Sequence, residues 1–326
     1  MTRIITSRTS HIALAGAGTL LALVCGCSGG TQPPVASSSA IAPQAKAGVH
    51  RHSWMSPDAK RKTLLYISDE QNNAVYAYSY PKGKLEGTLT GFTFPEGLCA
   101  DKNGDIFVAN NDSSNVIEYA HGGSQPIATL DDTGYYPTGC SVDPTTGNLA
   151  VTNTYNTSFT GGSVAVYAGA AGTPAQLTDT TLIYPRLSGY DPRGNLWVDG
   201  FNSSFSFTFS ELPAGGSTFT TISLNQTFGF PGGVQWDGSH VAVDDADANT
   251  IYQFSISGSS GTETGSTVLG GARDVGQFWQ HGKRVIGPDT LNADVGIWKY
   301  PAGGNAVKTI TGLAQPFGAT ISTRKK

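Results

Sequence analysis

The sequence predicts an all-β protein, a six-bladed β-propeller whose blades have four strands each. A Pro-x-Gly unit, followed by a turn and an alternating apolar strand, starts at residues 95, 137 and 231, and variants of it start at 185 (Pro-Arg-Leu) and 274 (Asp-Val-Gly). A last half-copy starts at 316. Steps of 42 to 48 residues match the length of a four-stranded propeller blade. Beyond residue 26, no stretch of useful length has the 3.6-residue periodicity of a helix.

The N-terminal segment is typical of an export signal. Two arginines precede an apolar run over residues 12–24, which is short for a membrane span but has the length of a signal-peptide core. The run closes on Val24-Cys25-Gly26-Cys27, which resembles the bacterial lipobox with Cys27 at the modified position. We expect residues 1–26 to be a lipoprotein signal peptide that is removed, leaving lipid on Cys27. The alternative is an ordinary secretory signal in which both cysteines are incidental.

Residues 27–62 are expected to form a lipidated, disordered tether, because they are rich in Ser, Ala, Pro and Gly and lack strand-like alternation. Their basic side chains suit an anionic membrane surface. The propeller is then expected over residues 63–323, followed by a basic tail at 324–326. Such a protein would be anchored to a bacterial membrane in the cell envelope and would face the periplasm or the exterior.

Each copy of the repeat predicts a first strand, a turn and a second strand. In the cleanest copy these are residues 95–100, the turn 101–104 and residues 105–110, with a third strand at 115–119. The copy at 274 is degraded, because Asp-Val-Gly replaces Pro-x-Gly there.

The two ends of the repeat region are expected to share one blade. The region opens at residues 64–69, which align with a second strand, and ends at residues 316–322, which align with a first strand. Pairing of these segments would close the ring and remove the exposed edges that an open array of blades would leave.

The charge of the chain argues against nucleic acid as a partner. The chain has 20 Lys and Arg against 24 Asp and Glu, and between Thr63 and Thr323 the counts are 10 against 23. An acidic body repels phosphate backbones. A hydrophobic content of 38% is enough to bury a core.

The strand ends resemble the repeats of a known family. Ile-Phe-Val-Ala-Asn (106–110), Leu-Ala-Val-Thr-Asn (149–153) and Leu-Tyr-Ile-Ser-Asp (65–69) stand beside Pro-x-Gly and Asp-x-x-Gly turns and are similar to NHL and YVTN propeller repeats. A looser similarity links them to the senescence-marker and gluconolactonase propellers. Lactonase-like members hold a divalent cation at the channel mouth with Glu, Asn and Asp. The equivalent triplets here break that ring, so the resemblance implies the fold but not lactonase activity.

Two sets of repeat positions are expected to converge on one rim of the propeller. The first strand of a blade starts on the face where the loop between its second and third strands lies. The residues that follow the Pro and the residues that close the second strand therefore supply candidate ligand contacts. These are Glu96, Thr138 and Arg186 from the first set, and Asp69, Asn110, Asn153, Asp245 and Asp289 from the second. Oxygen-bearing side chains around one mouth suit a cation or a sugar.

The closing Asp and Asn side chains also have a structural interpretation, which we favour. Such residues at strand ends bond the backbone of their own loop, and their repetition argues for structure. A specific site needs asymmetry. Glu96 and Arg186 are therefore the stronger candidates for ligand contact.

The densest acidic loop offers a candidate metal site. Asp245, Asp247 and Asn249 alternate as at the start of an EF-hand loop, but Thr250 replaces the invariant Gly and Ile256 replaces the bidentate Glu. An EF-hand is therefore excluded. A surface site for a divalent cation such as Ca²⁺ is the alternative to an ordinary hairpin, and no other cofactor is expected.

Aromatic residues precede the Pro of four blades, and packing between blades is favoured over a stacking platform for sugars or peptides. They are Phe94, Tyr136, Tyr184 and Phe230.

Cys99 and Cys140 come from neighbouring blades, and export permits a disulfide. Packed sheets lie about 10 Å apart, beyond the roughly 7 Å limit between bridged Cα atoms except close to the axis. Two buried thiols are therefore favoured over a bridge.

The sequence favours a non-enzymatic function, since no complete catalytic set can be read from it. The leading hypothesis is a lipid-anchored extracytoplasmic propeller that acts as a binding or scaffold module for a protein or glycan at the rim. The alternative is a metal-dependent hydrolase or lyase of the lactonase-like propeller type.

Overall fold

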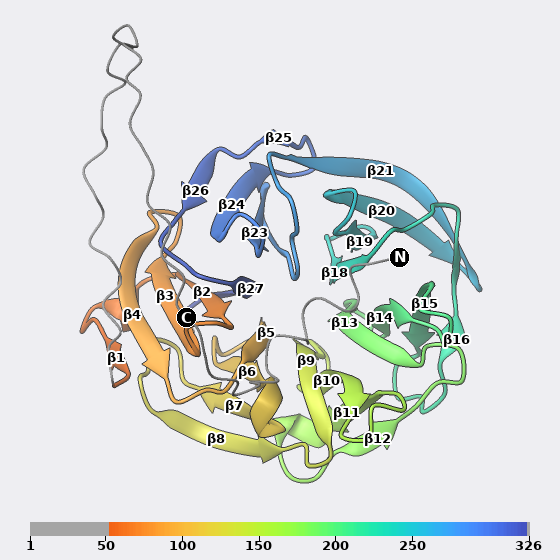
Figure 1. The fold of residues 1–326 in the computed structure, drawn as a ribbon, viewed down its shortest axis with the longest axis horizontal. Coiled ribbons are helices and arrows are strands. Elements are labelled where there is room, and N and C mark those ends of the chain that lie inside the picture. The colour runs from red at the N-terminus through yellow and green to blue at the C-terminus, as the bar shows by residue number, and fades with distance from the viewer. Residues whose placement is uncertain (1–51, 325–326) are drawn as a thin grey trace, which may run out of the picture. The chain divides into compact units, whose positions relative to one another are not determined.

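The computed structural model describes residues 52–324, which form six sheets arranged as the blades of one ring (Figure 1). Helical structure in this part of the chain is confined to three short 3-10 turns, at Ala59–Arg61, Asn111–Ser113 and Ala168–Ala170. The predicted all-β, six-bladed propeller is confirmed. The signal peptide and Cys27 lie outside the described residues.

The strands of each blade follow one another from the axis outward. Blade 1 has β27 (Pro316–Ser322), β2 (Leu64–Asp69), β3 (Ala74–Ser79), β4 (Lys84–Thr90) and β1 (Trp54–Met55). Blade 2 has β5 (Pro95–Ala100), β6 (Ile106–Asn110), β7 (Asn115–Tyr119) and β8 (Pro126–Asp131). Blade 3 has β9 (Tyr135–Val142), β10 (Leu149–Asn156), β11 (Ser163–Tyr167) and β12 (Ala175–Leu177).

The other three blades follow the same plan, with two short additions at the outside of the fifth. Blade 4 has β13 (Tyr184–Tyr190), β14 (Leu196–Phe201), β15 (Phe207–Leu212) and β16 (Thr220–Thr221). Blade 5 has β18 (Pro231–Trp236), β19 (Val241–Asp245), β20 (Thr250–Ser257) and β21 (Ser260–Gly270), with β17 (Ser223–Leu224) and β25 (Gly304–Asn305) pairing with β21. Blade 6 has β22 (Trp279–His281), β23 (Arg284–Asp289), β24 (Asp294–Lys299) and β26 (Lys308–Ile310).

The ring is closed as the strand order predicts. β2 pairs antiparallel with β27, from Leu64 opposite Ser322 to Asp69 opposite Pro316. Every residue of both strands is buried. The C-terminal strand is therefore the innermost strand of blade 1, and neither end of the ring leaves an open edge beside the axis.

The propeller begins earlier than the sequence indicated. Trp54 and Met55, which were assigned to the tether, pair with Thr88 and Gly87 and add a fifth strand to blade 1. A strand of two residues is too short to show the alternation by which strands are recognised. Its pairing with the outer edge of β4 became visible only in the fold.

The apolar core consists of six clusters, each lying between two neighbouring blades. In β2, Leu64 and Tyr66 face blade 2, whereas Leu65 and Ile67 face blade 6. Successive side chains of a strand point to opposite faces of its sheet. A blade packed on both faces is therefore apolar at every position, which explains the continuous apolar runs of the second strands.

The Pro-x-Gly unit is explained by the packing of the inner strands. Pro95 pairs with Asn110, and the register then shifts before Leu98, so that the two residues after the Pro form a bulge. A Cβ atom on Gly97 would lie 2.7 Å from the carbonyl oxygen of Thr138 in the next blade. The glycine is required because two backbones approach each other closely near the axis.

Blade 6 departs from the repeat where its sequence does. Its first strand is reduced to Trp279–His281, and near the axis only an isolated bridge joins Val275 to Asp289.

The preference for two free thiols is wrong. Cys99 and Cys140 form a disulfide with their Cα atoms 5.6 Å apart. Both lie on innermost strands, in the cluster between blades 2 and 3. The sheets converge toward the axis, so the distance there falls below the spacing of stacked sheets, which was the exception to the distance argument.

Candidate functional site

The predicted rim is the face on which the first strands begin and the second strands end, and we refer to it as the mouth face. In blades 1 to 5 the residue that closes the second strand pairs with the Pro of the first strand, as Asn110 does with Pro95 and Asp245 with Pro231. In blade 6, Val275 takes the place of the Pro and pairs with Asp289. Both sets of predicted residues therefore lie at one end of the ring.

Most closing residues clamp the loop that enters their own blade. The Asn110 side-chain oxygen accepts the N–H of Thr93 at 2.7 Å, and Asp289 accepts the N–H of Arg273 at 2.7 Å. Asp245 accepts four backbone N–H groups, those of Gly229, Phe230, Asp247 and Ala248, at 2.9 to 3.3 Å. These side chains satisfy loop donors, as the structural interpretation expects.

Asp69 makes the same clamp across the closure of the ring. Its carboxylate accepts the N–H groups of Ala314 and Gln315 at 2.8 and 3.1 Å, and both groups of Asn72 at 3.1 and 2.9 Å. The loop that it holds is 245 residues away in sequence, yet leads into the first strand of the same blade.

Thr138 and Asn153 also lie within the framework of the fold. The Thr138 hydroxyl accepts a hydrogen bond from Thr154 at 2.9 Å, and the Asn153 amide donates to Ser163 at 3.2 Å. Both side chains are buried, at 3% and 0% exposure.

In blades 1, 2, 3 and 6, side chains flanking the closing residue connect the blade to the next one. Asn111, Thr154 and Thr290 donate to the carbonyl groups of Pro137, Pro185 and Pro316 at 2.9 to 3.0 Å. One layer deeper, Ser68 donates to the carbonyl of Glu96 at 2.5 Å and Thr152 to that of Arg186 at 2.7 Å. The mouth face is therefore a rigid frame for the side chains that do not take part in it.

Arg186 contacts aromatic rings of two other blades at the mouth face. Its Cζ atom lies 4.7 Å from the ring centroid of Phe230 in blade 5 and 5.5 Å from that of Phe317 in blade 1. Its Nε atom is buried and has no hydrogen-bond partner among the described residues. A guanidinium that contacts aromatic faces can still donate hydrogen bonds from its N–H groups.

Two glutamates share the field of this arginine. Burial raises the pKa of Glu70 well above its ordinary value; the charge of Glu96 raises it further, and the charge of Arg186 opposes both effects. Glu70 also accepts a hydrogen bond from the Gln315 side chain. The predicted pair, Glu96 and Arg186, thus lies in one electrostatic neighbourhood that also includes Glu70.

Sequence reasoning missed Glu70. It follows Asp69 and so occupies the position at which blades 2, 3 and 6 have Asn111, Thr154 and Thr290. The acid at a position where other blades have a neutral hydrogen-bond donor is the signal that could have found it.

Two further carboxyl groups are fully buried at the level of the second strands. Burial raises the pKa of both Asp199 and Asp244 well above the ordinary value, and for Asp244 the nearby Asp245 adds to the effect. Neither oxygen of Asp244 has a hydrogen-bond partner among the described residues. Asp199 and Asp244 occupy the position from which Ser68 and Thr152 donate a hydrogen bond to the next blade in other parts of the ring. A protonated carboxyl, which is a donor, suits both sites.

The acidic loop of blade 5 is a hairpin connection. The Asp245 carboxylate accepts hydrogen bonds from backbone N–H groups of its own loop and of the loop that enters blade 5. Between residues 52 and 324, no group of three or more His, Cys, Asp or Glu side chains is placed to hold a metal ion.

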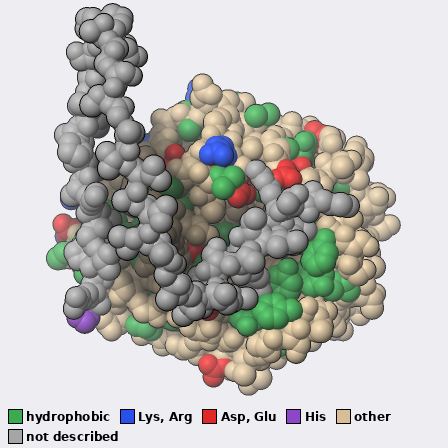
Figure 2. All heavy atoms as spheres, viewed as in Figure 1, with side chains coloured by type: hydrophobic (Ala, Val, Ile, Leu, Met, Phe, Trp, Pro, Cys, Tyr) green, Lys and Arg blue, Asp and Glu red, His purple; other side chains and the backbone are tan. Residues whose placement is uncertain are grey.

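A ladder of aromatic rings crosses the mouth face of blades 3 to 5. Figure 2 shows hydrophobic side chains gathered over blades 3 and 4. Neighbouring ring centroids are 4.9 to 6.4 Å apart along the whole series. In order, the ladder is Tyr136, Phe159, Tyr155, Tyr184, Phe205, Phe201 and Phe230. It ends beside Arg186, which stacks on Phe230.

The ladder changes the interpretation of the aromatic residues that precede the Pro. Tyr136, Tyr184 and Phe230 do contact rings of neighbouring residues, as packing requires, but they do so within an array that includes exposed rings. In blade 2, the backbone N–H of Phe94 donates to the side chain of Asn73 at 2.7 Å.

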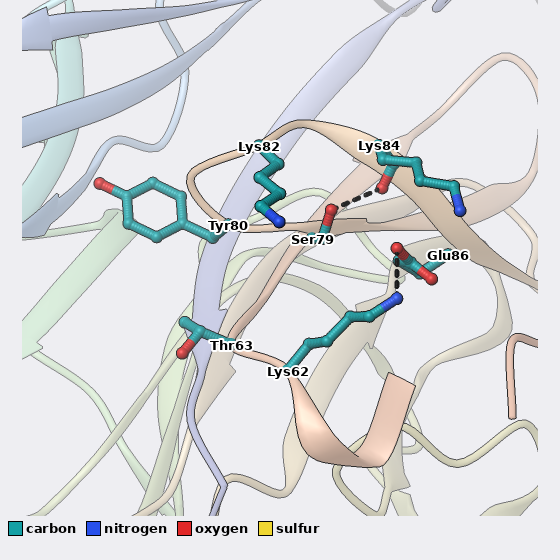
Figure 3. Close-up of a pocket in the computed structure, with 7 residues that line it drawn as sticks. All are labelled: Lys62, Thr63, Ser79, Tyr80, Lys82, Lys84 and Glu86. Carbon is teal, nitrogen blue, oxygen red and sulfur yellow. Dashed lines mark hydrogen bonds and ion pairs between the residues drawn. The ribbon is translucent and has the colours of Figure 1, made fainter. Parts of the chain in front are cut away.

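A cavity of about 320 Å³ lies at the opposite end of blade 1 and is basic (Figure 3). The Lys62 ammonium points to the Glu86 carboxylate, 2.7 Å away, while Lys82 and Lys84 project from the turn above it. Burial raises the pKa of Glu86, but hydrogen bonds from Lys62 and Ser56 outweigh it and the pKa lies below its ordinary value. This cavity is remote in the fold from the mouth face.

The fold and the comparisons define the same class of protein. The family model of the NHL repeat matches residues 92–119, which run from the entrance of blade 2 through its third strand. The chain is therefore a six-bladed β-propeller that contains an NHL repeat, as the resemblance implied.

Solved structures share the fold at low sequence identity. A chain of a nidogen/laminin complex has a TM-score of 0.64 at 17% identity, over 81% of this chain and 100% of that chain. A protein of unknown function from Bacteroides caccae has a TM-score of 0.61 at 11% identity, over the same shares. No curated protein matches the chain. The part of the chain described by the structure contains no helix long and apolar enough to cross a membrane.

Proposed function

We propose that this propeller is a binding module that takes a protein or glycan at its mouth face. The observation that carries the proposal is the convergence of unlike side chains from four blades, centred on Arg186. An acid pair, a guanidinium and aromatic faces around one mouth are the ingredients of a specific site. The clamps that surround them are repeated from blade to blade and leave this asymmetric group as the part that distinguishes the protein.

The test is a double substitution, Glu96→Gln with Arg186→Gln, in the full chain. The double substitution removes one charge of each sign, so the melting temperature should stay within about 2 °C of the wild type. Binding of the partner captured by the wild type from native envelope extract should be lost. The matched control, Lys82→Gln with Lys84→Gln, alters the basic cavity and should keep the partner. If the Glu96/Arg186 variant still binds the partner and the Lys82/Lys84 variant does not, the binding site is the basic cavity.

We further propose that lipid on Cys27 anchors the module to a bacterial membrane, facing the periplasm or the exterior. The lipobox-like motif before Cys27 supports this proposal. Acyl chains, in place of an apolar span, would hold the protein at the membrane. Cys27→Ala should move the protein from the detergent phase to the aqueous phase, whereas Cys25→Ala should leave it in the detergent phase. A Cys27→Ala variant that stays with the detergent would refute the anchor.

A further inference from the structure

Two loops on the mouth face are built alike. Residues 156–160 read Asn-Thr-Ser-Phe-Thr, and residues 202–206 read Asn-Ser-Ser-Phe-Ser. In each loop the Asn side-chain oxygen accepts the N–H groups two and four residues further on, at 2.9 to 3.1 Å. The N–H of each Phe donates to the carbonyl of the same Asn at 2.9 Å. Blades 3 and 4 therefore present Phe159 and Phe205 on the same scaffold.

The loop conformation does not require a phenylalanine at these two positions. Phe159 and Phe205 have φ angles of 57° and 56°, in the left-handed region that favours glycine and asparagine. A non-glycine residue held there costs on the order of 1–3 kcal/mol. The rings are 52% and 41% exposed, so burial offsets little of that cost. The other four blades hold Asn73, Ser114, Asn249 and Ala293 in the same left-handed region of the equivalent loop, with φ of 49° to 54°. What distinguishes blades 3 and 4 is that the residue held there is an exposed phenylalanine.

Both rings are fixed by stacking. Phe159 lies on Tyr136 with centroids 5.5 Å apart and ring planes 23° apart, and Phe205 lies on Tyr184 at 4.9 Å and 8°. Tyr155 joins the two pairs, at 5.8 Å from Phe159 and 5.2 Å from Tyr184. The rings are thus held as flat plates on neighbouring blades.

The chemistry around the plates selects an uncharged ligand. Neither loop contains a charged residue, whereas the body between Thr63 and Thr323 has 10 Lys and Arg against 23 Asp and Glu and repels polyanions. The N–H groups of residues 158–160 and 204–206 are already bonded within their loops, so a peptide backbone would find few donors. What the loops offer is ring faces, which carry negative charge density, beside Ser and Thr hydroxyl groups.

We propose that Phe159 and Phe205 form a stacking platform for a neutral glycan, with two sugar rings of one chain lying on the two phenyl faces. The weakly positive C–H face of a pyranose ring complements the negative face of a phenyl ring. This inference rests on the proposed binding function and names its ligand class.

The test measures binding of neutral hexasaccharides, made of glucose, mannose or N-acetylglucosamine, to the full chain by titration calorimetry. At least one hexasaccharide should bind, and Phe159→Ala and Phe205→Ala should each weaken it about tenfold, the effect of removing an aromatic anchor. Phe205→Trp should preserve binding because it keeps a flat ring. Ile127→Ala, which removes a 55% exposed side chain from the outer strand of blade 2, is the matched control and should bind as the wild type does.

Substitution by glycine separates binding from folding. Phe159→Gly and Phe205→Gly should lose the sugar while melting at or above the wild-type temperature, because glycine adopts these φ angles freely. Clear destabilisation by both would show that the rings serve the fold.

The inference is wrong if no hexasaccharide binds, or if the sugar binds equally well to the wild type and to both Ala variants. It is also wrong if the wild type binds a proline-rich peptide or heparin and the Ala variants no longer do. Its failure is distinguishable from that of the proposed function. An envelope partner that needs Glu96 and Arg186 but not the two Phe rings would leave the mouth site standing and remove only the glycan platform.

Discussion

The clamp made by Asp69 should be the most sensitive point of ring closure. Asp69→Ala removes a fully buried carboxylate that accepts four hydrogen bonds, two of them from Ala314 and Gln315 at the entrance to the C-terminal strand. Asn72 is exposed and its donors can turn to water. Ala314 and Gln315 are half-buried, and their N–H groups lose their acceptor.

The expected loss of folding stability follows from those two N–H donors. A buried polar group left without its partner costs about 1–3 kcal/mol. Asp69→Ala should therefore lower the free energy of unfolding by about 3 kcal/mol, a large part of the 5–15 kcal/mol typical of a domain. Asp69→Asn keeps one acceptor oxygen and should cost about half as much.

Urea unfolding followed by tryptophan fluorescence measures the change, and hydrogen exchange locates it. In Asp69→Ala, amides of β27 should exchange through an opening that is easier than global unfolding, because this clamp holds the loop that leads into the C-terminal strand. Asp245→Ala, which removes the same clamp inside blade 5, should leave β27 protected. Asp112→Ala, an exposed acid, should change stability by less than about 0.5 kcal/mol. A value for Asp69→Ala as small as that of Asp112→Ala would refute the reasoning.

Three other predictions test the frame of the propeller. Cys99→Ser should cost about 4 kcal/mol in urea unfolding, because the disulfide closes a sequence separation of 41 residues, and a reductant should then have no further effect. Asp244→Asn should stabilise the protein more at pH 8 than at pH 4.5. Burial raises the pKa of Asp244 in the folded state, so the wild type loses stability as the pH rises above the pKa of about 4 that this group has in the unfolded chain. A difference in melting temperature that does not depend on pH would contradict this. Deletion of residues 316–326 should abolish the cooperative melt, since it removes the innermost strand of blade 1; a retained cooperative melt would refute ring closure by that strand.

The repeat could be recognised in the sequence because its features depend on residues that are close together in the chain. The Asp-x-x-Gly turn shows this: the Asp101 side chain accepts the N–H groups of Asn103 and Asp105 at 2.8 and 2.9 Å, and Gly104 has a φ of 86°. In blades 2 to 5, the Pro that opens the blade and the residue that closes the second strand are likewise separated by a nearly constant number of residues. Such features are recognisable without knowing which blade lies beside which.

The candidate site was only partly legible. Glu96 and Arg186 were identified because they break the repeat, and the structure places them in one electrostatic neighbourhood. The clamping Asp and Asn residues could be interpreted as ligand contacts or as structural residues until their backbone partners were known. Phe159 and Phe205 carry no signal as single residues, since an isolated phenylalanine between polar residues has neither helical nor strand periodicity.

The sequence by itself determined the blade number, the strand order and the pairing of the chain ends, because period-two alternation and turn residues act between near neighbours. Only the tertiary structure decided the distances between blades. The bridge from Cys99 to Cys140, the seat of Arg186 on Phe230 and Phe317, and the aromatic ladder each join residues from different blades. Their contacts depend on how closely the sheets converge at the axis and at the mouth, which is a property of six packed interfaces acting together.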